Sequence, residues 1–267
     1  MELTATRFDV VDRIATLWLD RPHRSNAWTG TMHTEYRWIM AELEHRDDVR
    51  AVIVTGTGDR FCVGGDSTAL EAHVVHGGYD SGLPADPARP GGGSGIDADF
   101  AWQMGYRHPI VAAVNGACAG VGLALALFCD LRFVTPDARM TTAAPKLGLP
   151  AEYGMSWTLP RLVGTTRAAD LLLSGRVFTG AETADWGLWN GVTPDPYASA
   201  LSWATNLAAT TGPSAVATTK QQLAADAVRN SPEASVVASL ALMDQAMGTD
   251  EYAEGIAAFT QRRPPNF

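Results

Sequence analysis

Two stretches of the sequence place small residues where an apolar strand pattern gives way to a helix pattern. In AVIVTGTGDRFCVGGDSTALEAH, Gly64 and Gly65 precede a helix expected to start near Asp66. In VAAVNGACAGVGLALALF, Gly120 precedes a helix expected to start near Val121. The first turn of a helix carries N–H groups without partners, and small residues let a ligand approach them closely. Two such turns directed at one point would form an oxyanion hole, whereas each alone could equally reflect tight packing.

A phosphate site is the rival interpretation of these turns. Neither stretch has the G-x-x-x-x-G-K-[ST] pattern, nor a G-x-G-x-x-G turn with a matching acidic residue downstream. Those patterns are typical of phosphate and dinucleotide sites. Nucleotide binding is therefore weakly supported.

The elements that must position these turns have the patterns of an α/β core. FDVVDRIATLWLD alternates around Asp12 and Arg13 as a hairpin does, and AVIVTG and IVAAVN are β-branched runs typical of buried strands. Strands that alternate with helices indicate crossover units and a mostly parallel sheet. One helical stripe is expected from Met32, Tyr36, Ile39, Met40 and Leu43.

The stretch from Pro109 to Asp130 has no charged side chain between Ile110 and Cys129. By length it could cross a bilayer, which takes about 20 apolar residues. However, the turn dipeptide Asn115-Gly116 divides it into a strand and a helix. We therefore expect a buried core segment and no membrane partner.

Composition excludes other classes of function. Among 267 residues, 29 acidic and 20 basic side chains give a net charge of −9, which disfavours a general nucleic-acid role. The three cysteines, Cys62, Cys118 and Cys129, have neither disulfide-framework nor metal-ligand spacing. The start MELTATRFDV lacks the pattern of a signal peptide. We expect free thiols, no metal and a cytoplasmic protein.

Two regions differ in pattern from the α/β core. Residues 77–95 are rich in glycine and proline and are predicted to form a mobile flap, with a functionless insertion as the alternative. From about Ala181 onward the pattern is almost entirely helical. We therefore predict an α/β core over residues 1–195 and a helical region over 196–267.

Six pieces of the chain, in order, resemble the crotonase superfamily, also called the enoyl-CoA hydratase/isomerase family: RPHRSNAW, VIVTGTGDRFCVGGD, VAAVNGACAGVGLALALFCDLRF, KLGLPAEYGMSWTLPRLVG, LLLSGRVFTGAETADWGLWNGV and QRRPPNF. The resemblance implies a spiral of ββα units with a helical C-terminal trimerisation region, in a homotrimer or hexamer. It also implies an acyl-CoA substrate, with coenzyme A as part of the substrate and no separate cofactor. The N–H groups of Gly65 and Val121 then stabilise a thioester enolate.

The resemblance also indicates which acid or base works with these amides. In hydratases of the family two glutamates hold the water that is added, and their positions correspond here to Ala124 and Ala144. Glu152, in LGLPAEYG, stands where some isomerases of the family carry a single catalytic carboxylate. We therefore expect isomerase-type chemistry. The alternatives are a hydrolase or decarboxylase of the same fold, a non-catalytic acyl-CoA binding protein, and, for Glu152 itself, a solvated loop carboxylate.

For coenzyme A, the resemblance implicates the backbone around Arg24, Ser25 and Ala27, together with the segment from Gly64 to Asp66. Asp66 has a second interpretation as a helix cap. In the tail, Arg262 and Arg263 could offer charge to the nucleotide phosphates of a neighbouring subunit, since a guanidinium fits phosphate well. A solvated tail is the alternative.

Overall fold

The computed structural model describes residues 1–76 and 96–267, and the predicted flap at 77–95 lies outside the described residues. The chain begins with the expected hairpin of β1 (Thr6–Val11) and β2 (Ile14–Leu19), which pair antiparallel. Its turn residues Asp12 and Arg13 both have positive φ, 49° and 70°. A two-residue turn of this kind matches the twist of the strands that it joins.

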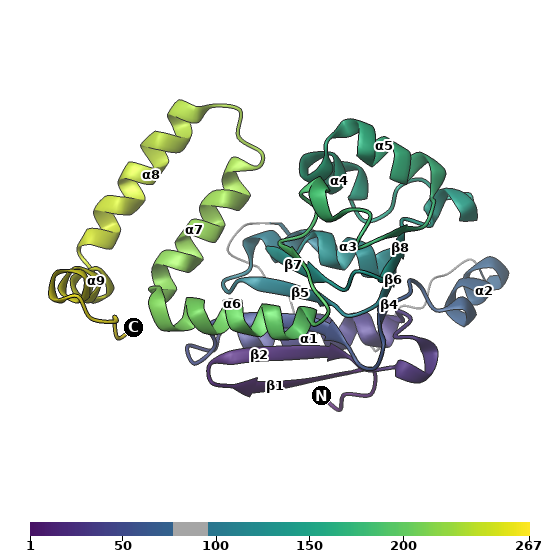
Figure 1. The fold of residues 1–267 in the computed structure, drawn as a ribbon, viewed down its shortest axis with the longest axis horizontal. Coiled ribbons are helices and arrows are strands. Elements are labelled where there is room, and N and C mark those ends of the chain that lie inside the picture. The colour runs from purple at the N-terminus through teal and green to yellow at the C-terminus, as the bar shows by residue number, and fades with distance from the viewer. Residues whose placement is uncertain (77–95) are drawn as a thin grey trace.

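The large sheet has the strand order β1-β2-β3-β5-β7-β10, and every pair in it beyond the hairpin is parallel (Figure 1). Its remaining strands are β3 (Ala51–Gly56), β5 (Ile110–Val114), β7 (Leu131–Val134) and β10 (Gly191–Val192). All residues of β3 and β5 are buried, because the main core packs on one face and α6 (Pro196–Thr210) packs on the other. Burial on both faces explains why these strands appear in the sequence as continuous apolar runs.

A small sheet runs in the order β4-β6-β8-β9. Its strands are β4 (Arg60–Cys62), β6 (Ala117–Ala119), β8 (Arg139–Thr141) and β9 (Phe178–Thr179). The pairs β3 and β4, β5 and β6, and β7 and β8 each place their first strand in the large sheet and their second in the small one. Helices then follow: α2 (Ser67–His76) after β4 and α3 (Val121–Leu127) after β6. This repetition is the predicted spiral of ββα units.

The predicted stripe on α1 (Gly30–Glu44) is confirmed. Its five apolar residues are at most 1% exposed, and the N-cap residue Thr29 accepts a hydrogen bond from the Met32 N–H. Two further helices, α4 (Met155–Val163) and α5 (Thr165–Ser174), pack against each other above the small sheet (Figure 1).

The C-terminal helices leave the body of the molecule. After α6 come α7 (Pro213–Asp226), α8 (Pro232–Met247) and α9 (Asp250–Gln261), and Figure 1 shows α8 and α9 far from both sheets. No residue of α8 is buried, and Phe259 on α9 is 84% exposed. Because α6 packs on the large sheet, the division at 195/196 is a change in secondary structure, and its meaning as a domain boundary stays a prediction. None of the described helices is long and apolar enough to span a bilayer.

Candidate active site

The first of the two glycine turns is held by the backbone of Trp28. The Trp28 N–H donates to the Gly64 carbonyl over 2.8 Å, and the Asp66 N–H donates to the Trp28 carbonyl over 2.9 Å. In such a parallel bridge the intervening residue, Gly65, directs its own N–H away from Trp28. Within the described residues the Gly65 N–H has no hydrogen-bond acceptor. This amide is therefore free to bind a ligand.

The second turn presents its amide in a comparable way. Gly120 has φ 49° and ψ −120°, and its N–H donates to the Thr141 carbonyl over 3.1 Å. Val121 is the first residue of α3, so its N–H has no acceptor in the helix and none elsewhere in the described part of the chain. The Val121 side chain packs in the main core and is 4% exposed. Its bulk is thus accommodated by the core.

The two turns touch because β4 and β6 are neighbours in the small sheet, with Cys62 opposite Cys118. A Cβ atom built on Gly120 would lie 3.8 Å from the Gly64 Cα. Glycine at position 122 permits this approach, since a Cβ there would lie 2.5 Å from the Cys62 carbonyl oxygen. The structure therefore brings together the two glycine turns that the sequence pattern indicated.

Glu152 lies in the loop before α4, half-buried, and its carboxylate makes no hydrogen bond or ion pair with any described residue. Burial raises the pKa of this carboxyl above its ordinary value. By contrast, Ala124 in α3 and Ala144 are fully buried and have no group that can carry a proton. Glu152 is thus the titratable candidate among the three positions.

A row of aromatic rings connects the Glu152 loop to the first glycine turn. Tyr153, at φ 48°, packs its ring edge to face against Phe100 with the centroids 5.5 Å apart. Phe100 in turn packs against Trp28 at 5.5 Å, and Trp28 is the residue that pairs with Gly65. Trp28 and Phe100 were not among the site residues expected from the sequence, because neither aromatic has a chemical signal of its own.

Asp66 is engaged in structural contacts. Its carboxylate pairs with Arg21 at 3.1 Å and Arg24 at 2.9 Å, and it caps α2 by accepting the Thr68 N–H at 3.0 Å. The hydrogen bond from Arg24 is the largest of the effects that lower the Asp66 pKa to about 2. Arg21 also donates to the Ala27 carbonyl at 2.6 Å.

These contacts fasten the segment around Arg24, Ser25 and Ala27 to the segment from Gly64 to Asp66. The two stretches expected to contact coenzyme A are therefore adjacent. The side chains of Arg24 and Asp66 bind each other, and the Arg24 side chain remains 42% exposed. Arg21, which makes two of these contacts, was missed as a functional residue because its Arg-Pro dipeptide signals only a turn.

Within one chain the two tail arginines lie away from the two glycine turns. Arg262 ends α9 with φ 54°, and Arg263 pairs with Glu254 through two contacts of 2.6 and 2.8 Å. The hydrogen bond from Arg263 lowers the pKa of Glu254 to about 2. In Figure 1 α9 and α2 lie at opposite ends of the molecule. A single chain therefore does not bring these arginines to Gly65.

Comparison with known proteins identifies the class. The sequence profile of the family described as Enoyl-CoA hydratase/isomerase matches residues 10–87 and 92–267. The 1,2-epoxyphenylacetyl-CoA isomerase of Escherichia coli (strain K12) is 29% identical over 266 residues, covering 95% of this chain and 94% of the relative. A probable enoyl-CoA hydratase of Mycobacterium tuberculosis (strain ATCC 25618 / H37Rv), EchA14, is 37% identical over 196 residues, covering 73% of this chain and 72% of the relative.

The fold agrees with solved structures. A probable enoyl-CoA hydratase/isomerase from Mycobacterium abscessus superimposes with a TM-score of 0.84 at 29% identity, covering 98% of both chains. A putative enoyl-CoA hydratase from Streptomyces coelicolor A3(2) gives a TM-score of 0.84 at 31% identity, covering 100% of this chain and 94% of the other. The chain belongs to the enoyl-CoA hydratase/isomerase family, the crotonase superfamily.

Proposed function

We propose that the protein is an acyl-CoA enzyme that moves the double bond of a 3-enoyl thioester to the 2-position, with Glu152 as its single acid and base. The observation that carries this proposal is the environment of Glu152. Its carboxylate is half-buried without a partner among the described residues, and its loop contacts the aromatic row that ends at Trp28, the residue that pairs with Gly65. A carboxyl with a raised pKa is suited to proton transfer near neutral pH.

In this mechanism the N–H groups of Gly65 and Val121 bind the thioester carbonyl oxygen. Neither amide has an acceptor in the described part of the chain, and the turns that carry them are in contact. Such donors stabilise the negative charge that develops on the oxygen in the transition state, and the loss of one typically costs about 2.7–4 kcal/mol.

The proton moves in two steps. The Glu152 carboxylate removes a proton from C2 of the 3-enoyl thioester, and the electron pair delocalises as a dienolate onto the oxygen held by the two amides. The protonated Glu152 then returns the proton to C4, which leaves the double bond between C2 and C3. No water is added and the carboxylate is regenerated, so one titratable group suffices. Alanine at positions 124 and 144 accords with this chemistry, because it supplies no second carboxylate to hold water.

Coenzyme A enters only as part of the substrate. We place it against the backbone of the segment around Arg24, Ser25 and Ala27 and of the segment from Gly64 to Asp66, which lie side by side. In a homotrimer or hexamer, Arg262 of a neighbouring copy would supply charge to the phosphates, while Arg263 stays with Glu254. The relative from Escherichia coli carries the name of a CoA-thioester isomerase, which supports isomerisation as a reaction of this family.

The test compares two substrates on the purified protein. With a 3-enoyl-CoA we expect double-bond migration, which is monitored by the absorbance of the conjugated 2-enoyl thioester. With a 2-enoyl-CoA we expect no 3-hydroxyacyl product. Hydration that survives Glu152→Ala at a rate near that of the unchanged protein would contradict the assignment. Tight coenzyme A binding without turnover of any thioester would instead support a non-catalytic binding protein, and release of free coenzyme A would support a hydrolase.

A further inference from the structure

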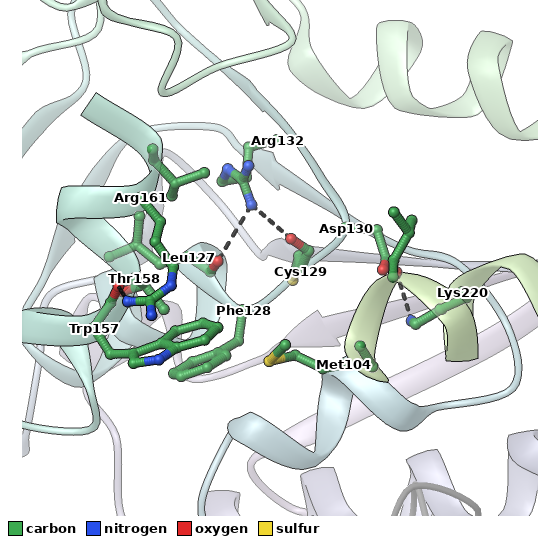
Figure 2. Close-up of a pocket in the computed structure, with 13 residues that line it drawn as sticks. Met104, Leu127, Phe128, Cys129, Asp130, Arg132, Trp157, Thr158, Arg161 and Lys220 are labelled. Atoms are coloured by element: carbon green, nitrogen blue, oxygen red, sulfur yellow. Dashed lines mark hydrogen bonds and ion pairs between the residues drawn. The ribbon is translucent and has the colours of Figure 1, made fainter. Parts of the chain in front are cut away.

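A second pocket lies at the other end of α3, between α3, α4 and α7. It has a volume of about 310 Å³ (Figure 2). Its apolar walls include Met104, Phe128 and Trp157, and its cationic residues are Arg132, Arg161 and Lys220. Asp130 is the acidic residue among those lining it. The pocket's lining includes neither the glycine turns nor Glu152, and the axis of α3 rises about 9 Å from Val121 to Leu127.

Arg132 has an unused donor in this pocket. Its side chain is only 7% exposed, and its Nε and Nη1 atoms donate to the carbonyl groups of Leu188, Leu127 and Cys129. Nη2 makes no hydrogen bond with any described residue, and it keeps some contact with solvent. Nη2 is thus not completely enclosed, and since Arg132 lines the pocket, this atom is the one through which Arg132 could donate to a ligand.

The positive charge of this pocket is only partly compensated. Lys220 pairs with Asp130 at 2.5 Å. Neither Arg132 nor Arg161 forms an ion pair within the described residues. The Arg161 guanidinium stacks 3.9 Å from the Trp157 ring centroid and donates one hydrogen bond, to the Trp157 carbonyl. Arg132 is buried, and a buried charge without a counter-ion is unfavourable, whereas Arg161 is exposed. An anion bound here would relieve this cost, in a chain whose net charge is otherwise −9.

We propose that this pocket binds the carboxylate of a small organic acid, with Arg132 and Arg161 holding the carboxylate and Phe128 and Trp157 packing against the apolar body. A guanidinium presents paired N–H donors that match the two oxygens of a carboxylate. The volume is at the lower end of that found for ligand pockets, which suits an acid the size of phenylacetate. The inference does not depend on the chemistry proposed for Glu152.

The first test is calorimetric titration of the full chain with phenylacetate and with phenylacetamide, its neutral analogue of the same shape. We expect the acid to bind at least tenfold more tightly. Arg161→Gln should weaken acid binding at least fivefold and leave amide binding unchanged. Its matched control is Arg167→Gln, since Arg167 also stacks on a tryptophan, Trp186, at 4.9 Å but lies outside the pocket.

Three outcomes would overturn the proposal: no binding of the acid, equal binding of acid and amide, or equal effects of the two arginine substitutions. Arg161 is exposed, so its replacement tests the pocket without loss of the buried Arg132 contacts.

The source of the carboxylate is tested by displacement of bound phenylacetate. If adipyl-CoA displaces it and hexanoyl-CoA does not, the pocket holds the distal carboxylate of a thioester. If neither displaces it, the pocket holds a free acid. Equal displacement by both thioesters would show that phenylacetate occupies the acyl site instead, and the proposal would be wrong.

Discussion

The segment that carries Asp66 and the loop that carries Glu152 hold their carboxylates in opposite ways. Asp66 is 3% exposed, is bound by two arginines and a backbone amide, and has its pKa lowered to about 2. Glu152 is half-buried with no partner among the described residues, and burial raises its pKa. The comparison shows how environment separates a carboxylate that fastens two segments together from one that is free to exchange a proton.

The largest effect is expected for Glu152→Gln. We predict that kcat for double-bond migration falls roughly 10²–10⁴-fold, because the amide cannot accept the proton from C2. The unfolding free energy at pH 7 should be unchanged or should rise by less than about 1 kcal/mol, since a partly desolvated charge is removed and solvent screens the exposed part. Stopped-flow absorbance and urea denaturation measure the two quantities. A large loss of stability in this variant would mean that Glu152 has a structural role like that of Asp66.

For Asp66→Asn we expect the reverse pattern, lower stability with catalysis reduced less than in Glu152→Gln. Removing the negative charge weakens four hydrogen bonds and leaves Arg21 and Arg24 without their counter-ion, which costs about 1.5–3 kcal/mol. Urea denaturation at pH 7 measures the difference. The matched control is Asp170→Asn, which removes an exposed pair with Arg176 and should cost at most about 1 kcal/mol.

The two carboxylates should also respond oppositely to pH. The Asp66 pKa is lowered from 3.8 to about 2, so its contribution to stability is present above 3.8 and is lost as the pH falls through about 2. The difference in unfolding free energy between the unchanged protein and Asp66→Asn should therefore shrink over this interval. The Glu152 pKa is raised above 4.5, so kcat/KM should fall on acidification through a pKa higher than 4.5. If the acidic limb of the kcat/KM profile has a pKa at or below 4.5, the group that titrates is not Glu152.

The smallest change in activity is expected for Val121→Ala. The proposed donor is the backbone N–H and the side chain packs in the core, so kcat should stay within about threefold of the original value while stability falls by about 1–3 kcal/mol. Steady-state kinetics and thermal denaturation measure the two effects. A loss of activity comparable to that of Glu152→Gln would show that the valine side chain itself contacts the substrate.

The residue patterns predicted the elements best where local periodicity is strong. The hairpin, the buried strands β3 and β5 and the stripe on α1 were all expected from their apolar spacing. The strands of the small sheet are two or three residues long, and no periodicity is measurable over so short a run. Yet the contact between β4 and β6 is what brings the two glycine turns together.

The amino-acid sequence alone establishes which groups are present: two glycine turns at helix starts, alanine at positions 124 and 144, and a glutamate at 152. It also determined the family, because the motifs run along nearly the whole chain. Which of these groups have partners depends on how distant segments pack in the folded chain. Within the described residues, Asp66 meets arginines 42 and 45 positions away, the Glu152 carboxylate has no partner, and Nη2 of Arg132 makes no hydrogen bond. Protonation and binding depend on such contacts between distant segments, which residue type and spacing do not encode.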